Sequence, residues 1–230
     1  KDDDKSEVIR QQYKALITEA HALAGLTLEP GALDAIYGLE EAIARAHMTK
    51  EETRNFANNY TKFDQGDLGS LMPDVPWDQF LEAFGLPEPG YLVSVTTPFF
   101  EKLEPIVDSV PVADWKLYLR WQVLNSQASR LTRVLDDRNF EFYGKALRGR
   151  EEQRPDWKRA VGVVDEGLGE LVGKVYVEKH FPPEAKERMD VLVANLVKAY
   201  QDSVKALDWM SEETKAEALD KLSKFEPKIG

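Results

Sequence analysis

Apolar side chains recur with the 3.6-residue period of an α-helix along most of this chain, and this pattern restricts it to a largely helical fold. Residues 6–25 show the pattern most clearly, because one side of a helix there would carry Ile9, Tyr13, Leu16, Ile17, Ala20 and Leu23. Ser6 is placed to cap the start of that helix. Gly25 is placed to end it in a left-handed conformation.

Further helices are predicted over residues 30–47, 49–60, 76–85, 98–110, 112–131, 157–181, 182–207 and 211–225. The segment 91–97 is the one convincing extended stretch, because it is rich in β-branched residues and is bounded by Gly90 and Pro98. It needs a pairing strand from elsewhere in the chain, or it is an extended connector. We therefore predict an all-α fold, with at most this one extended segment, in a single domain over residues 1–230.

Three local patterns refine the helical prediction. Thr49 and Glu52 have the spacing of a capping box, which should open the helix over residues 49–60. The helix over residues 112–131 has a predicted apolar face made of Trp115, Leu119, Val123 and Leu124. The helix over residues 157–181 carries four glycines, each of which costs roughly 1 kcal/mol relative to alanine: Gly162, Gly167, Gly169 and Gly173. Either another backbone packs very close to this helix, or the helix is broken midway.

Charge and composition exclude several classes of function. The formal net charge of -11 argues against nucleic acid as the main partner, because phosphate binding needs a basic face. The chain has no cysteine, so disulfides and thiolate metal sites are excluded. No apolar run approaches the length of a membrane-spanning helix, so we expect no membrane contact from this segment. The opening KDDDKS is either an affinity-tag remnant or a native acidic flank.

The sequence holds no complete active site, so we predict no catalytic residue and no metal ligand in this chain. His21, His47 and His180 lie far apart, and no two of them have the one-turn spacing of a zinc-binding helix. A Gly-x-Ser-x-Gly nucleophile motif and a phosphate-binding GxxxxGK[ST] loop are both absent. Adjacent acidic pairs such as Glu40 and Glu41 point about 100° apart on a helix, so we interpret them as side chains of a solvated face or of a helix start.

A cationic cluster over residues 145–159 stands out in this acidic chain. Its candidates for anion or interlobe contacts are Arg148, Arg150, Arg154, Lys158 and Arg159. Pro155 is a natural first helical residue, so the arginines should lie in a loop that leads into a helix start, where an anion can bind. They can equally form bidentate pairs with the chain's own carboxylates and fix the loop in place.

The same region carries a set of motifs found together in one family. They are Phe142-Tyr143-Gly144, Arg154-Pro-x-Trp-Lys-Arg159, Gly173-Lys-x-Tyr-Val177 with the following Phe181-Pro182, and the stretch 207–230. In these motifs the chain resembles the neprilysin-type zinc metallopeptidase family, which includes neprilysin, endothelin-converting enzyme and bacterial enzymes similar to oligopeptidase O. The resemblance covers most of the chain and is densest over residues 114–230.

The resemblance implies a two-lobed peptidase of which this chain is the smaller, covering lobe. The family's zinc is held by HExxH and ExxxD helices in a catalytic lobe, and neither motif occurs in these 230 residues. We therefore expect this chain alone to be catalytically incomplete and to hold no cofactor. Its partner would be the catalytic lobe of the same protein, and short peptides would be the substrates of the whole enzyme.

The resemblance does not decide the cellular compartment, or whether this chain acts as part of a larger enzyme or as a stand-alone module. Relatives include envelope-anchored, secreted and cytoplasmic enzymes. We expect the cell envelope or secretion, with the cytoplasm as the alternative. The alternative function is a stand-alone helical binding module that uses the basic loop from Arg148 to Arg159 to hold an acidic partner.

Overall fold

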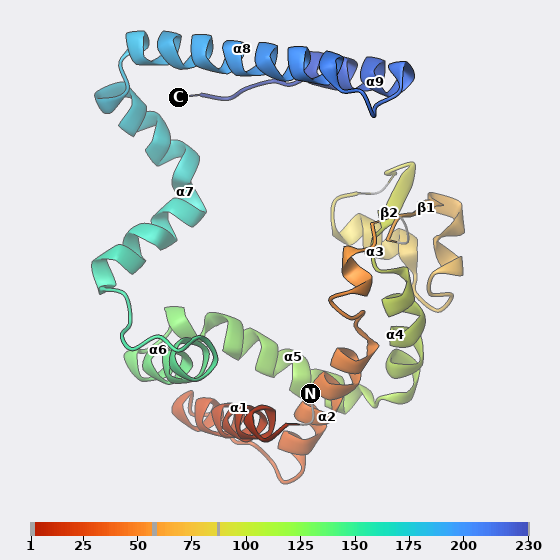
Figure 1. Cartoon of the computed structure of the whole chain (residues 1–230). Coiled ribbons are helices and arrows are strands. Elements are labelled where there is room, and N and C mark those ends of the chain that lie inside the picture. The colour runs from red at the N-terminus through yellow and green to blue at the C-terminus, as the bar shows by residue number, and fades with distance from the viewer. Residues whose placement is uncertain (1–2, 57–58, 87, 230) are drawn as a thin grey trace. The chain divides into compact units, whose positions relative to one another are not determined.

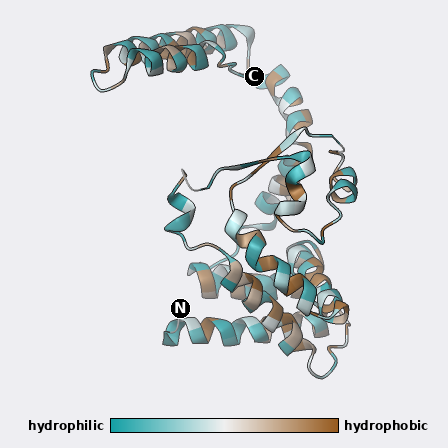
Figure 2. Ribbon diagram, turned by 90° about the vertical axis from the view of Figure 1, so that its right-hand side faces the viewer, coloured by the Kyte–Doolittle hydropathy of each residue, from teal (hydrophilic) through white to brown (hydrophobic). Residues whose placement is uncertain are grey.

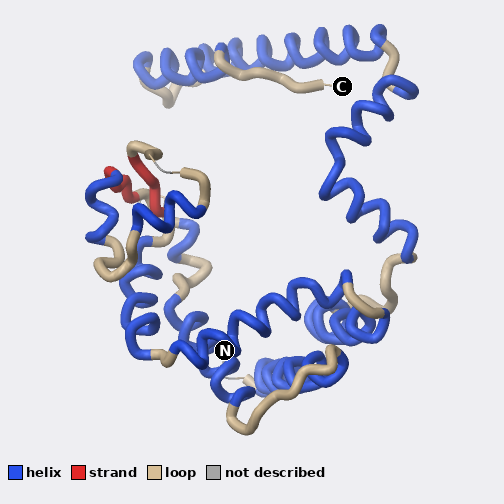
Figure 3. Tube along the Cα trace, turned by 180° about the vertical axis from the view of Figure 1, so that it is seen from behind, coloured by secondary structure: helices blue, strands red, loops and turns tan. Residues whose placement is uncertain are grey.

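The computed structural model describes residues 3–56, 59–86 and 88–229, and helices make up most of it (Figure 1; Figure 3). The predicted all-α fold class is confirmed. The chain divides into two compact units, residues 1–153 and residues 154–230. The expectation that residues 1–230 form a single lobe stays a prediction. Among the described residues, none of the helices combines the length and the apolar character needed to cross a membrane.

The first unit consists of helices, single helical turns and one small sheet. In chain order its elements are α1 (Asp4–Leu23), α2 (Ala32–Ala46), η1 (Glu52–Arg54), β1 (Thr61–Asp64), η2 (Gln65–Ser70), α3 (Trp77–Ala83), β2 (Tyr91–Ser94), α4 (Thr97–Ser109), α5 (Val112–Gln127), η3 (Ala128–Arg130), α6 (Arg133–Asn139) and the π-helical η4 (Phe140–Ala146).

Helix α1 begins and ends as a capped helix, but its N-cap differs from the prediction. The Asp3 side chain accepts a hydrogen bond of 2.7 Å from the Ser6 backbone N–H, so Asp3 is the cap and Ser6 is the capped residue. Aspartate serves this position well because its charge also complements the helix dipole. Gly25 follows the helix with φ of 69°, in the left-handed conformation that was predicted.

The core of the first unit lies where α1, α2, α5, α6 and η4 meet. Its members are Leu16, Ile17, Ala20, Ile36, Trp121, Leu124, Leu135 and Phe142. For α5 the predicted apolar face is correct for Leu124, which is in the core, but wrong for Leu119 and Val123, which are 55% and 65% exposed. Trp121, which was not predicted to be on that face, is fully buried. Helix α5 carries apolar residues on more than one side, so its sequence did not decide which side packs.

The segment 91–97 finds its pairing strand in β1. Strands β1 and β2 are antiparallel, with Thr61 opposite Ser94 and Asp64 opposite Tyr91. The predicted helix over residues 49–60 is reduced to the single turn η1, and residues 57–58 lie outside the described residues. The capping box itself is present, since Thr49 N–H donates to Glu52 Oε2 at 2.6 Å and Glu52 N–H donates to Thr49 Oγ1 at 3.2 Å.

The second unit consists of α7 (Asp156–His180), α8 (Pro183–Ala206) and α9 (Glu212–Ser223). Helices α8 and α9 lie side by side, and hydrophobic and hydrophilic residues are mixed along both (Figure 1; Figure 2). Helix α7 is broken at Leu168, where φ is -134° and ψ is 17°. The flanking glycines, Gly167 and Gly169, therefore agree with the explanation that this helix is interrupted midway. None of the described residues of α7, α8 or α9 is buried.

Two other glycines of α7 can be replaced to test whether its surface has room for an added methyl group. Gly162 and Gly173 lie in its regular parts, and no described atom is within 4 Å of the place that a Cβ would take. We expect Gly162→Ala and Gly173→Ala each to raise the free energy of unfolding by roughly 0.5–1 kcal/mol, because alanine favours the helix. Urea denaturation followed by circular dichroism measures this effect. Gly149→Ala is the contrasting variant: its φ of 66° strains any residue with a Cβ, so stability should fall.

Candidate functional site

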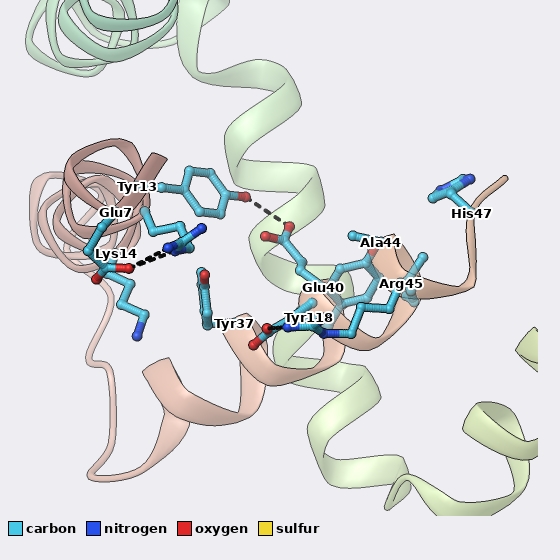
Figure 4. A pocket seen from close by; sticks show the side chains of 12 residues that line it. Glu7, Tyr13, Lys14, Tyr37, Glu40, Ala44, Arg45, His47 and Tyr118 are labelled. Carbon is cyan, nitrogen blue, oxygen red and sulfur yellow. Dashed lines mark hydrogen bonds and ion pairs between the residues drawn. The ribbon is translucent and has the colours of Figure 1, made fainter. Parts of the chain in front are cut away.

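A cleft of about 860 Å³ opens between α1, α2 and α5 in the first unit (Figure 4). Its lining is dominated by charged and tyrosine side chains, with Glu7, Arg10, Tyr13 and Lys14 from α1, Tyr37, Glu40, Glu41 and Arg45 from α2, and Tyr118 from α5. Such a lining is suited to a polar or charged ligand rather than to a purely apolar one.

Glu40 is the end point of a hydrogen-bond network that joins the three helices. The Tyr13 hydroxyl donates to Glu40 Oε1 at 2.8 Å, and Gln122 Nε2 donates to the same oxygen at 2.6 Å. The buried indole N–H of Trp121 donates in turn to the Tyr13 hydroxyl oxygen at 2.9 Å. Each of these donors is neutral, so the half-buried carboxylate of Glu40 is held without a cation.

Burial governs the titration of the groups in this network. Desolvation raises the pKa of Glu40, although the hydrogen bonds from Tyr13 and Gln122 act in the opposite direction. Desolvation likewise raises the pKa of Tyr13 far above that of a free tyrosine. Tyr13 therefore stays protonated at neutral pH, and its hydroxyl acts as a hydrogen-bond donor to Glu40, not as a base.

The other acidic residues of the cleft have partners of opposite charge. Glu7 pairs with Arg10 at 2.6 Å, and Glu41 pairs with Arg45 at 2.6 Å. Glu40 and Glu41 thus point in different directions, as their adjacent positions on α2 predict. The prediction that both are solvated is wrong for Glu40, which lies one turn after the buried Ile36 on the packed side of α2.

The histidines occupy separate and ordinary environments. His21 is buried, with Nδ1 2.7 Å from the Ile17 carbonyl oxygen and its ring stacked on Trp121. His47 stacks on Phe99. His180 lies beside Tyr176, with ring centroids 4.8 Å apart. Across the described ranges 3–56, 59–86 and 88–229, no group of three or more His, Asp or Glu residues could hold a metal ion.

The five predicted contact residues are divided between the two units. Arg148 and Arg150 follow η4 in the first unit, where Arg150 N–H donates to the Gly144 carbonyl at 3.0 Å. Arg154, Lys158 and Arg159 belong to the second unit. There Arg159 pairs with Asp156 at 3.5 Å, and Lys158 lies over the Trp157 ring. The roles proposed for these five residues, in anion or interlobe contacts, stay a prediction.

The side chains of Arg148, Arg150 and Arg154 are exposed, and none forms an ion pair with a carboxylate of the described residues. We therefore expect the triple variant Arg148→Gln, Arg150→Gln, Arg154→Gln to change the free energy of unfolding by less than about 0.5 kcal/mol. Chemical denaturation measures this change. A loss of several kcal/mol would instead mean that these arginines pair with carboxylates and fix the fold.

The Phe142-Tyr143-Gly144 motif has a packing role in the first unit. Phe142 is in the core, and the Tyr143 hydroxyl oxygen accepts a hydrogen bond of 2.7 Å from Asn125 Nδ2. A Cβ on Gly144 would lie 2.2 Å from Cδ2 of Phe140, so the position has no room for a larger residue. The π-helical turn η4 brings these side chains together, and π-helical turns interrupt helices mostly where a specific geometry is needed.

Comparisons with known proteins agree on one family. The family model described as "Peptidase family M13" matches residues 1–230. Neprilysin-11 of Caenorhabditis elegans is 26% identical over 205 residues, which cover 86% of this chain and 24% of that protein. The zinc metalloprotease Zmp1 of Mycobacterium tuberculosis in its open state is 34% identical with a TM-score of 0.79, over 98% of this chain and 36% of that chain.

A second structure of Zmp1, described as a partial open state, is 35% identical with a TM-score of 0.72, over 99% of this chain and 36% of that chain. The chain thus spans about a quarter of the length of Neprilysin-11 and about a third of the Zmp1 chains. The likeness to Zmp1 extends through both units, whereas it leaves most of each longer protein unmatched.

Proposed function

Because this chain belongs to peptidase family M13, we propose that it is the helical substrate-gating lobe of a bacterial neprilysin-like zinc metalloendopeptidase. In this role the chain selects substrates by steric exclusion and supplies no catalytic residue. Helices that cover a peptidase site exclude folded proteins and admit flexible peptides, and their movement controls entry and product release. The observation that carries the proposal is the family match over residues 1–230, in a chain whose described residues contain no group able to hold a metal.

In the whole enzyme, zinc binding and catalysis would belong to residues outside these 230. The chain matches about a third of a protein that is named a zinc metalloprotease, which supports a division of labour between matched and unmatched parts. The direct partner of this lobe is then the catalytic lobe of the same protein. Short peptides are its substrates, and the cell envelope or the extracellular space is its compartment.

Movement of the lobe is part of the proposal. Zmp1 is described in an open state and in a partial open state, and this chain matches both. The break of α7 between Gly167 and Gly169 supplies a point within the second unit at which the backbone departs from the helix. A helix interrupted by flanking glycines bends at lower cost than a continuous one.

Peptide hydrolysis tests the proposal at two levels. The purified 230-residue chain should not cleave a fluorogenic peptide, whereas the longer polypeptide that contains it should cleave the peptide and lose that activity to a chelator. The longer polypeptide should also cleave a flexible peptide much faster than the same sequence placed within a folded protein. Chelator-sensitive cleavage by the 230-residue chain itself would contradict the assignment, and equal cleavage of both substrates would contradict the gating role.

A further inference from the structure

We propose that the cleft between α1, α2 and α5 binds a cationic group, the guanidinium or ammonium of an arginine or lysine side chain in a peptide, with Glu40 as the carboxylate that receives it. The proposal does not depend on the gating function, because it concerns binding by the first unit alone. Figure 4 shows the Glu40 carboxylate turned toward the Tyr13 hydroxyl, with Tyr37 and Tyr118 among the other lining side chains.

Glu40 is the carboxylate of the cleft whose charge no cation neutralises. Both of its hydrogen bonds come from neutral donors, Tyr13 and Gln122, and both end on Oε1. A half-buried carboxylate held in this way keeps its position, and a cation brought to it would form a charge-assisted hydrogen bond and offset the desolvation of the charged form. The other two acids, Glu7 and Glu41, are already paired with Arg10 and Arg45, so a cationic ligand would gain less from them.

The tyrosine walls favour the same kind of ligand. Cations bind over the faces of aromatic rings, and the rings of Tyr13, Tyr37 and Tyr118 line this cleft. One such contact already exists, because Lys14 Nζ lies 4.2 Å from the centroid of the Tyr37 ring. The cleft therefore accepts an ammonium group from its own chain, and a cationic ligand would compete with Lys14 for the face of Tyr37.

Other ligand classes fit less well. An anion would have to displace Glu7 or Glu41 from its arginine partner, or draw Lys14 away from the Tyr37 ring, because Arg10, Arg45 and Lys14 are the cations of the lining. An apolar ligand would leave the hydroxyl and carboxylate groups of the lining unpaired, which is unfavourable. A volume of about 860 Å³ leaves room for a long side chain together with part of its backbone.

Calorimetry with matched probes tests the proposal on the 230-residue chain. The probes are an acetylated, amidated tripeptide with a central arginine, the same peptide with citrulline, which is neutral and nearly isosteric, and spermidine as a free amine. The arginine peptide should bind at least about tenfold more tightly than the citrulline peptide, and Glu40→Gln should remove that preference. Equal affinity for the two peptides would overturn the proposal, and binding of spermidine alone would overturn the peptide as its source.

A matched control separates a site from general attraction to an acidic chain. Glu29→Gln removes the same charge from an exposed residue that does not line the cleft, so the affinity should not change. An equal loss in both variants would mean non-specific attraction and would overturn the site.

Two further variants keep the test decisive even if Glu40→Gln does not fold. Tyr37→Leu leaves the network of Tyr13 and Glu40 intact and should weaken binding of the arginine peptide by about twofold to fivefold. Lys14→Gln removes the internal competitor for the Tyr37 face and should strengthen binding. The proposed geometry would be overturned if both variants fold and bind the arginine peptide with unchanged affinity.

Discussion

Replacing Trp121 with alanine is expected to lower the free energy of unfolding by about 3–5 kcal/mol. The Trp121 side chain is fully buried, stacks on His21 with ring centroids 5.8 Å apart, and meets Tyr13 edge-on at 6.0 Å. Its removal leaves a large cavity at the centre of the first unit. It also removes the N–H that donates to the Tyr13 hydroxyl in the network that ends on Glu40. Urea denaturation followed by near- and far-ultraviolet circular dichroism measures the loss.

Val123 offers the matched control on the same helix. Its side chain is 65% exposed, so Val123→Ala should change the free energy of unfolding by less than about 0.5 kcal/mol. Trp121→Phe should fall between the two, because it keeps an aromatic ring but loses the indole N–H, a hydrogen bond worth about 1 kcal/mol. Similar losses for Trp121→Ala and Val123→Ala would contradict the packing of α5 described above.

Helix α5 shows why the sequence predicted the helix but not its buried side. Leu119 and Val123 repeat at helical spacing, and so do Trp121, Leu124 and Ala128, so two stripes compete. Hydropathy alone favours neither. The packed side is the one whose polar groups find partners on other helices, as Gln122 does on Glu40 and Asn125 does on Tyr143. Those partners are set by the tertiary structure, and the periodicity of one helix carries no information about its contacts with other helices.

The segment after Thr49 shows the limit of a local signal. The capping box forms its two hydrogen bonds, so the predicted helix start is correct. A cap stabilises the first turn but does not set the length of a helix. Here the chain leaves the helical conformation after one turn and enters β1 at Thr61. Strand β1 pairs with β2, which lies within the predicted extended segment 91–97. A four-residue strand such as β1 is too short to be recognised by alternation alone.

The candidate site was only partly visible in the sequence. Glu40 follows Ile36 by four residues on α2, and this spacing on the apolar stripe was the available signal that one acid of the pair points inward. Its partners are Tyr13, 27 residues earlier, and Gln122, 82 residues later, and no local pattern links them. The basic loop was visible as local charge, but whether carboxylates pair with Arg148 and Arg150 depends on the tertiary structure.

The motifs of residues 114–230 identify the family, yet the second unit provides little of the core. Its apolar side chains are numerous, and half or more of the surface of several is exposed, as for Leu168, Leu171, Tyr176, Val191 and Tyr200. In the first unit, by contrast, Leu16, Ile17 and Ile36 are almost completely buried. Helices that bury no side chain lack the tertiary packing that supplies most helical stability in proteins.

Hydrogen exchange of the 230-residue chain is therefore expected to differ sharply between the two units. Amides in the middle of α1 and α5 should be protected at least about 100-fold more strongly than amides in the middle of α7 and α8. The first set should open only when the core around Trp121 unfolds, whereas the second should open locally. Exchange followed by NMR or mass spectrometry, with each amide referred to its intrinsic rate, measures the ratio.

The concentration dependence of exchange decides what an unexpected result means. Exposed apolar side chains such as those of α7 and α8 favour association, and association would slow exchange there as the protein concentration rises. Protection that is equal in both units at high concentration but falls in α7 and α8 on dilution would locate a self-association surface on the second unit. Equal protection at every concentration would contradict the prediction, because it would require side chains of α7 and α8 to be packed in the monomer.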